Sequence, residues 1–145
     1  KIKKIKMNYK IVAKYIKDLN FKISDTKTFF LLAENIANYK VKINIKSNPI
    51  KEKIISIETT ILLSPVKEDL KNIIANITHS TLIEFDEEIS DKKKLEKIIL
   101  VEVPTAVYPD LRKTFIHLFE SSGFKNIKID EVINFEKLYE QRKTQ

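Results

Sequence analysis

The side chains that could carry out acid–base or nucleophilic chemistry are few in this chain and lie far apart. There are two histidines, His79 and His117, and no cysteine. His79 alternates in register with apolar residues, and such a histidine is more often packed in a core or an interface than used as a base. His117 falls on the polar face of a predicted helix, where a solvated histidine is the usual case. Two histidines 38 positions apart, without cysteine, do not predict a metal site.

Acidic residues gather at residues 85–91, FDEEISD, but three lysines follow directly at 92–94. This pattern is typical of a solvated charged turn. A calcium loop would need a glycine at its bend, and the only glycine in the chain is Gly123. One glycine is also too few for a phosphate-binding loop. The sequence therefore predicts no enzyme, no cofactor and no metal.

The composition predicts a single domain of ordinary size with a charged surface. The chain has 145 residues, of which 43% are hydrophobic and 32% charged, and its formal net charge is +7. No apolar stretch approaches the roughly 20 residues of a membrane span. Residues 1–10 lack the apolar segment of a secretory signal. We therefore expect a cytoplasmic protein with a flexible N-terminal extension at 1–8 and one domain at 9–143.

Four segments alternate between apolar and polar residues with a period of two, which predicts half-buried β-strands. They are residues 9–23, 39–47, 52–64 and 72–85. The clearest is YKVKINIKS, which places Val41, Ile43 and Ile45 on one face and lysines on the other. Short polar connectors at 47–51 and 64–69 favour antiparallel neighbours, because parallel crossovers need a dozen or more residues.

The period becomes helical after about residue 90. Ser90 or Asp91 can cap a short helix, and Pro104 is expected to end it. A longer helix is predicted from Pro109, and Gly123 is placed to serve as the left-handed residue beyond its end. One stripe of this helix is apolar and consists of Leu111, Phe115, Leu118 and Phe119.

Strands first and helices last predict an α+β fold. We expect a four-stranded antiparallel sheet with the long helix and a short C-terminal helix, capped by Asn134, packed on one face. Residues 24–38 lack a clear period, and we expect a loop there with an apolar cluster at 29–32. Long, Ile-rich edge strands promote pairing with another chain, so an edge or face of the sheet is expected to meet another subunit.

Two classes of function remain from the residues alone. Basic strands can bind single-stranded nucleic acid, but here lysines are spread along the whole chain and mixed with acidic residues. No aromatic-rich RNA-binding strand is present in the sequence. The alternative is a groove that takes extended apolar peptide, because the strands and the last helix carry many large apolar residues.

Three stretches carry a family resemblance. VPTAVYPDLR at residues 103–112 leads into the long helix, SSGFKNIKIDEVINFEKLYEQ at 121–141 follows it, and YIKDLNF lies near the start at 15–21. They resemble the C-P-x-x-L-F-P-Y-A-R, V-N-F-x-x-L-(Y/F) and Y-x-K-D-x-S-F motifs of the protein-export chaperone family SecB. Both prolines, the aromatic residue before the second proline and the later arginine match the first motif.

The resemblance implies a chaperone that holds unfolded precursor proteins in an export-competent state and delivers them to the SecA translocation motor. It implies a homotetramer built as a dimer of dimers, which pairs through sheets and long helices, and no cofactor. In this reading Pro104 and Pro109 fix the entry of the long helix, and residues 134–143 lie over the sheet as a movable rim. A SecB-like chaperone dedicated to one partner, such as an antitoxin, and a basic nucleic-acid-binding module remain as alternatives.

The resemblance also implies site residues. The client-binding groove is predicted at Val41, Ile43, Ile45, Phe135, Leu138 and Tyr139. The helix of the oligomer interface is predicted to use Leu111, Phe115, Leu118 and Phe119. Asp18 keeps one acidic position of the SecA-contact face, whereas Lys22 and Asn76 replace acidic ones. Most family members are strongly acidic, and this chain is basic.

Overall fold

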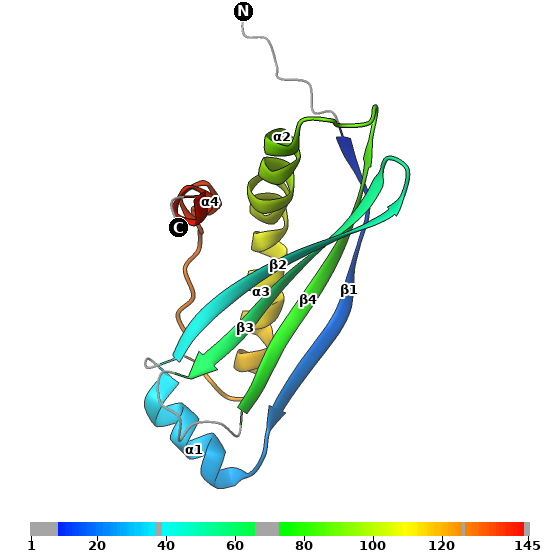
Figure 1. Cartoon of the computed structure of the whole chain (residues 1–145). Helices are drawn as coiled ribbons and strands as arrows, with labels where there is room; N and C mark the ends of the chain where they lie inside the picture. Colours follow the sequence, from blue (N-terminus) through cyan, green and yellow to red (C-terminus); the bar gives the residue numbers. More distant parts are fainter. Residues whose placement is uncertain (1–8, 37–38, 66–72, 126, 144–145) are drawn as a thin grey trace, which may run out of the picture.

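Four long strands form one antiparallel sheet in the computed structural model, which describes residues 9–36, 39–65, 73–125 and 127–143. The strands are β1 (Tyr9–Ile23), β2 (Tyr39–Lys51), β3 (Ile54–Pro65) and β4 (Ile73–Phe85). Their order is β1-β4-β3-β2, so β1 and β2 are the edge strands (Figure 1). The predicted sheet and its antiparallel pairing are confirmed. The predicted extension at 1–8 lies outside the described residues.

The turn between β2 and β3 is shorter than the sequence suggested. The predicted connector at 47–51 is part of β2, and Glu52 and Lys53 make the turn, with Lys53 at a left-handed φ of 69°. Pro49 is tolerated in β2 because an edge strand does not need every backbone N–H for pairing. A register shift between Pro49 and Lys51 marks an irregularity beside it.

Residues 24–38, expected as a loop, contain the helix α1 (Thr26–Asn35). Asp25 caps it by accepting a 2.8 Å hydrogen bond from the Thr28 backbone N–H. The helical period was hidden because Leu32 is buried, whereas its neighbour Phe30 is 59% exposed. Because an apolar residue also lies on the exposed side of the helix, the sequence shows no single apolar face with helical spacing.

The two prolines of the helical region lie inside one continuous helical segment, contrary to the prediction. The helix α2 (Lys92–Lys97), the π-helical turn η3 (Ile98–Glu102) and the helix α3 (Val103–Ser121) follow one another without a break, as one rod in Figure 1. Pro104 therefore does not end a helix, and Pro109 lies inside α3 instead of at its start. In the π turn the Val103 N–H bonds the Ile98 carbonyl, five residues back. This wider turn accommodates a proline that would disrupt the regular i→i−4 pattern.

The predicted end of the long helix is confirmed. Gly123 has a φ of 98°, which favours glycine, and its N–H donates to the Glu120 carbonyl at 3.1 Å. The Phe124 N–H donates to the Phe119 carbonyl at 3.0 Å, and the two rings lie 5.9 Å apart. The chain then returns towards the sheet and forms the last helix, α4 (Phe135–Lys143).

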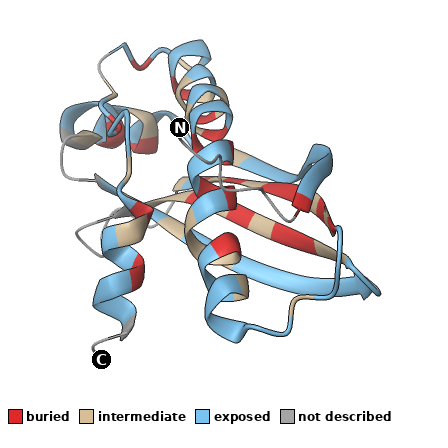
Figure 2. Cartoon of the chain, turned by 90° about the horizontal axis from the view of Figure 1, so that it is seen from above, coloured by how far each residue is buried: buried red, intermediate tan, exposed pale blue. Residues whose placement is uncertain are grey.

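The core lies between α3 and the central strands β3 and β4. Side chains with no exposed surface come from both layers: Ile57, Ile61, Ile77 and Ile83 from the strands, and Val107, Leu111, Phe115 and Phe119 from the helix. Figure 2 shows the buried residues in red along the central strands and the facing helix. Residues 10–20 of β1, by contrast, are all exposed.

None of the described helices combines the length and the apolar character that a membrane crossing needs.

Candidate functional site

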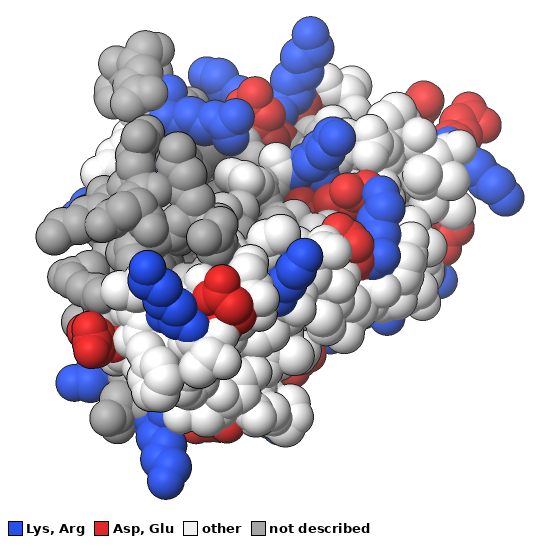
Figure 3. Space-filling view, turned by 90° about the horizontal axis from the view of Figure 1, so that it is seen from below, with Lys and Arg blue, Asp and Glu red and all other residues white. Residues whose placement is uncertain are grey.

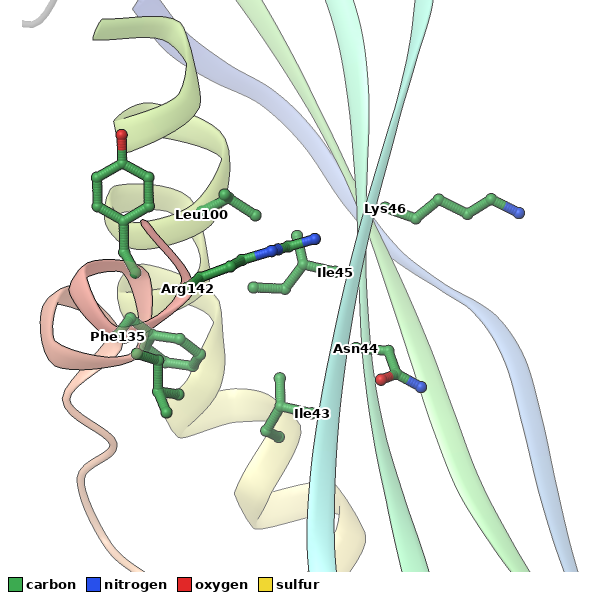
Figure 4. Close-up of a pocket in the computed structure, with 9 residues that line it drawn as sticks. Ile43, Asn44, Ile45, Lys46, Leu100, Phe135 and Arg142 are labelled. Carbon is green, nitrogen blue, oxygen red and sulfur yellow. The ribbon is translucent and has the colours of Figure 1, made fainter. Parts of the chain in front are cut away.

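A groove of about 570 Å³ lies between the edge strand β2 and the helix α4 (Figure 4). Its lining comes from β2, η3 and α4 and consists of Ile43, Asn44, Ile45, Lys46, Leu100, Phe135, Leu138, Tyr139 and Arg142. The side chains of Ile43 and Ile45 point into the space between the strand and the helices, whereas Lys46 points to the other side of the strand. The interior of the groove is therefore mainly apolar.

Five of the six predicted groove residues are brought together here, and these are Ile43, Ile45, Phe135, Leu138 and Tyr139. The sixth, Val41, lines a smaller neighbouring pocket of about 250 Å³ with Tyr108, Ile129 and Ile133. The alternation of β2 accounts for this. Val41 shares the face of Ile43 and Ile45 but lies closer to the start of the strand, beside the segment that leads to α4.

The groove residues differ in how much surface they leave open. Phe135 is 3% exposed and Tyr139 is 7% exposed, so they hold α4 in place. Leu138 is 48% exposed, and Ile43 and Ile45 are half-buried. These three side chains supply apolar surface that nothing in the described part of the chain covers.

Two groove residues, Leu100 and Arg142, were missed from the sequence. Leu100 lies in η3, where the π turn adds a residue and rotates the apolar face that regular helical spacing would place at Leu95, Ile98 and Ile99. Arg142 lies in a charged terminal segment that is typical of a solvated helix face. No local pattern signals that it meets β2.

The segment that leads to α4 is tied to α3 by two residues of the VPTAVYPDLR stretch. The Tyr108 hydroxyl donates to the Asp130 carbonyl at 2.5 Å, and the Arg112 Nε donates to the Ile129 carbonyl at 3.1 Å. Burial raises the pKa of the Tyr108 hydroxyl, so it stays a donor. This motif therefore positions one wall of the groove.

Helix α4 itself is held by a cap and two polar contacts. Asn134 caps it, as predicted, by accepting a 2.9 Å bond from the Lys137 N–H. The Tyr139 hydroxyl donates to Glu96 Oε1 at 3.2 Å, and burial together with this carboxylate raises the pKa of Tyr139. Lys97 lies 3.1 Å from Glu136. Exposed pairs of this kind contribute little, so α4 is attached more weakly than the core helix.

Three of the four predicted interface residues face inward. Leu111, Phe115 and Phe119 have no exposed surface and fill the chain's own core, while Leu118 is half-buried. These three side chains therefore cannot meet another subunit, because they already pack against the sheet. That α3 takes part in an interface stays a prediction, and it now concerns the opposite face, where Pro109, Asp110, Arg112, Lys113, Thr114, Ile116, His117 and Glu120 surround a hollow of about 720 Å³.

Asp18, the predicted SecA contact, lies exposed on β1, next to a register shift between Ile16 and Asp18. Its Oδ2 accepts a 2.9 Å bond from Asn20, which also donates to Asn76 on β4 at 3.1 Å. The carboxylate is thus held on the surface of the sheet and remains accessible.

The two histidines lie where the sequence placed them. His117 is exposed on the outer face of α3, 3.4 Å from the Ser121 hydroxyl. His79 is 9% exposed, and neither ring nitrogen has a hydrogen-bond partner among the described residues. The buried hydroxyls of Thr59 and Thr81 lack partners as well. His79 is thus a packed histidine that makes no hydrogen bond to Thr59, its register partner on β3.

An apolar surface runs along β1. Its exposed side chains are Ile11, Val12, Tyr15, Ile16 and Leu19, with Ile74 on the adjacent β4. Since β1 pairs only with β4, its other edge carries backbone groups that no described strand pairs. This surface is separate from the groove, which adjoins the opposite edge of the sheet.

Known proteins match this chain over nearly its whole length. The family model described as preprotein translocase subunit SecB matches residues 3–145. A putative protein-export protein SecB of Pelagibacter ubique is 41% identical over 135 residues, which cover 93% of this chain and 96% of that protein. The protein-export protein SecB of Cupriavidus taiwanensis is 26% identical over 128 residues, or 88% of this chain and 72% of that protein.

The fold has a solved counterpart. A Mycobacterium tuberculosis SecB-like chaperone, in complex with a ChAD peptide from the HigA1 antitoxin, has a TM-score of 0.65 and covers 87% of this chain and 88% of its own. Its identity to this chain is 10%, so it supports the fold alone. The family match and the 41%-identical relative confirm the resemblance carried by the three motifs: this chain belongs to the SecB family of protein-export chaperones.

Proposed function

We propose that this protein holds unfolded precursor proteins by binding their extended apolar segments in the groove between β2 and α4, and delivers them to the SecA motor in the cytoplasm. The observation that carries the proposal is the open apolar lining of that groove. Ile43, Ile45 and the 48%-exposed Leu138 stay accessible although Phe135 and Tyr139 close the floor.

The energetics of such binding do not depend on a particular sequence. Burial of an apolar side chain contributes roughly 25 cal/mol per Å² of surface removed from water. β2 is an edge strand, so its free backbone groups can pair with an extended client chain. Neither contribution reads side-chain identity closely, which suits a protein that must hold many unfolded chains.

A refolding assay with a groove variant tests the client-holding function. The purified protein is expected to delay refolding of a slow-folding precursor, and Leu138→Asp should weaken this hold about fivefold or more, because it places a charge where apolar surface is buried. Val132→Asp is the matched control, since Val132 is 79% exposed and outside the groove. Equal activity of the two variants would count against the groove, and an inactive wild type against the function.

Delivery to SecA and assembly into a homotetramer are parts of the same proposal. Asp18 supplies an accessible carboxylate for SecA. The apolar surface of β1 and the outer face of α3 are two separate surfaces, as a dimer of dimers requires. Binding of the wild type and of Asp18→Lys to purified SecA, measured by calorimetry, tests the contact, and loss of affinity is expected in the variant.

A nucleic-acid-binding function is not favoured. Figure 3 shows positive and negative side chains interspersed on the face it presents, and no continuous basic stripe there. A salt titration separates the two functions, because phosphate binding weakens steeply as salt rises, whereas apolar burial persists.

A further inference from the structure

The groove contains one charged side chain whose role apolar burial does not explain. Among the nine lining residues the only charged ones are Lys46 and Arg142, and both are cationic. Lys46 points to the far side of β2, whereas Arg142 extends from α4 across the groove towards Ile45 (Figure 4). Within the described part of the chain, no hydrogen bond or ion pair engages Arg142.

Two carboxylates near this end of the groove, those of Glu96 and Glu136, already have partners. Glu96 accepts the Tyr139 hydroxyl at 3.2 Å. It also lines, with Arg142, a pocket of about 290 Å³ that adjoins the groove, without forming an ion pair with it. Glu136 is paired with Lys97 at 3.1 Å. The guanidinium of Arg142 thus lies among apolar side chains with its donors unused by the chain.

A guanidinium in this position selects its ligand by charge and shape. It is always protonated and presents planar paired donors that match a carboxylate in a bidentate manner. Arg142 is exposed, so both this attraction and the repulsion of a second cation are modest and are screened by salt. A segment with an acidic side chain beside its apolar residues therefore complements the groove, and one with a lysine there does not.

We propose that the groove prefers extended apolar segments that carry an aspartate or glutamate, and that Arg142 binds that carboxylate. This preference rests on the proposed client-holding function and adds to it the chemical class of segment that is held best. Arg142 acts here as a specificity residue, whereas Ile43, Ile45 and Leu138 supply affinity without regard to charge.

The test uses three synthetic apolar peptides that differ at one position, with Glu, Gln or Lys, and measures their affinity for the full chain by fluorescence anisotropy. The Glu peptide is expected to bind about two- to fivefold more tightly than the Gln peptide, the range of a partly exposed ion pair. The Lys peptide should bind most weakly, and high salt should reduce the differences.

Variants assign the preference to one side chain. Arg142→Gln should bring the Glu-to-Gln affinity ratio to about one, whatever the absolute affinities, while Arg142→Lys keeps part of the ratio. Lys27→Gln, which removes one exposed charge on the distant α1, is the control for net charge and should keep the full ratio. Circular dichroism verifies that each variant is folded.

Two outcomes would overturn the preference alone: equal binding of the Glu and Gln peptides to the wild type, or a ratio that survives in Arg142→Gln. A ratio lost equally in Lys27→Gln would assign it to net charge and overturn the role of Arg142. Failure of all three peptides to bind would overturn the client-holding function and the preference with it.

Discussion

The groove contains buried residues that anchor its wall and exposed residues that a client can contact. Phe135 and Tyr139 lie below a tenth exposed and anchor α4, whereas Leu138, one helical position away from Tyr139, is 48% exposed. Replacement of an anchor would remove the wall of the groove, so its effect on clients would be indirect. Replacement of Leu138 changes only the surface that a client meets. Functional tests of this family member are therefore best made at exposed groove positions.

A pH dependence of stability follows from His79. Burial lowers its pKa below the ordinary 6.5, and the charges that face it act in opposite directions: Asp110 on α3 raises the pKa and Lys14 on β1 lowers it. Because the folded chain favours the neutral ring, the unfolded chain takes up the proton first as the pH falls. The contribution of the neutral His79 ring to the free energy of unfolding is therefore complete above about pH 6.5, and it is lost as the pH falls from there towards the lower pKa of the folded chain.

Urea unfolding of the wild type and of His79→Leu at about pH 7.5 and about pH 5.5 measures this effect. The wild type is expected to lose more stability between the two pH values than the variant, whatever their absolute stabilities. Equal losses would show that His79 does not titrate differently in the folded and unfolded chains.

At the scale of elements, the long rod and the return of the chain set the position of the groove. α2, η3 and α3 continue through Pro104 because a π turn accommodates it, and Gly123 then reverses the chain so that α4 reaches β2. The groove thus depends on one residue that can take a positive φ. A Cβ at Gly123 would lie 3.6 Å from the Phe29 ring, an ordinary contact, so the cost of a side chain there is in the backbone.

Gly123→Ala is expected to destabilise the protein by about 1–2 kcal/mol, because alanine is strained at a φ of 98°. Thermal or urea unfolding measures the loss. Ser121→Ala, at an exposed position of the same helix end, is the control and should change stability by less than about 0.5 kcal/mol. A neutral Gly123→Ala would mean that the turn can adopt another conformation.

At the scale of the whole molecule, the two edges of the sheet have different roles in the proposal. The edge at β2 adjoins the groove for clients, and the edge at β1 carries the row of exposed apolar residues. Since such an edge promotes pairing, self-association through β1 would leave the groove at β2 open.

Light scattering coupled to gel filtration tests this assembly. The wild type is expected at four times the 17.0 kDa of one chain. Val12→Lys combined with Tyr15→Lys, two side chains about half exposed on β1, should lower the mass through like-charge repulsion and lost apolar burial. Phe30→Lys on α1, 59% exposed, should leave it unchanged. A monomeric wild type would contradict the tetramer.

The sequence by itself determined the strands, a cap at Ser90 or Asp91, the cap at Asn134, the turn at Gly123 and, through its motifs, the family. The structure then placed the first cap at Asp91. These features are local: alternation, a side-chain oxygen before a helix, or a residue without a Cβ acts over a few neighbours. The family resemblance placed Ile43, Ile45 and Leu138 at a groove, and the local period predicted only that strand and helix each present one face.

Only the tertiary structure decided which apolar residues stay open. Leu111, Phe115 and Phe119 looked available for a partner but fill the core, since α3 turns its most apolar stripe to the sheet. The helix α1, the passage through Pro104 and the approach of Leu100 and Arg142 to β2 depend on contacts between segments distant in sequence. Exposure is a property of packed surfaces, and sequence spacing records the face of an element without recording what covers it.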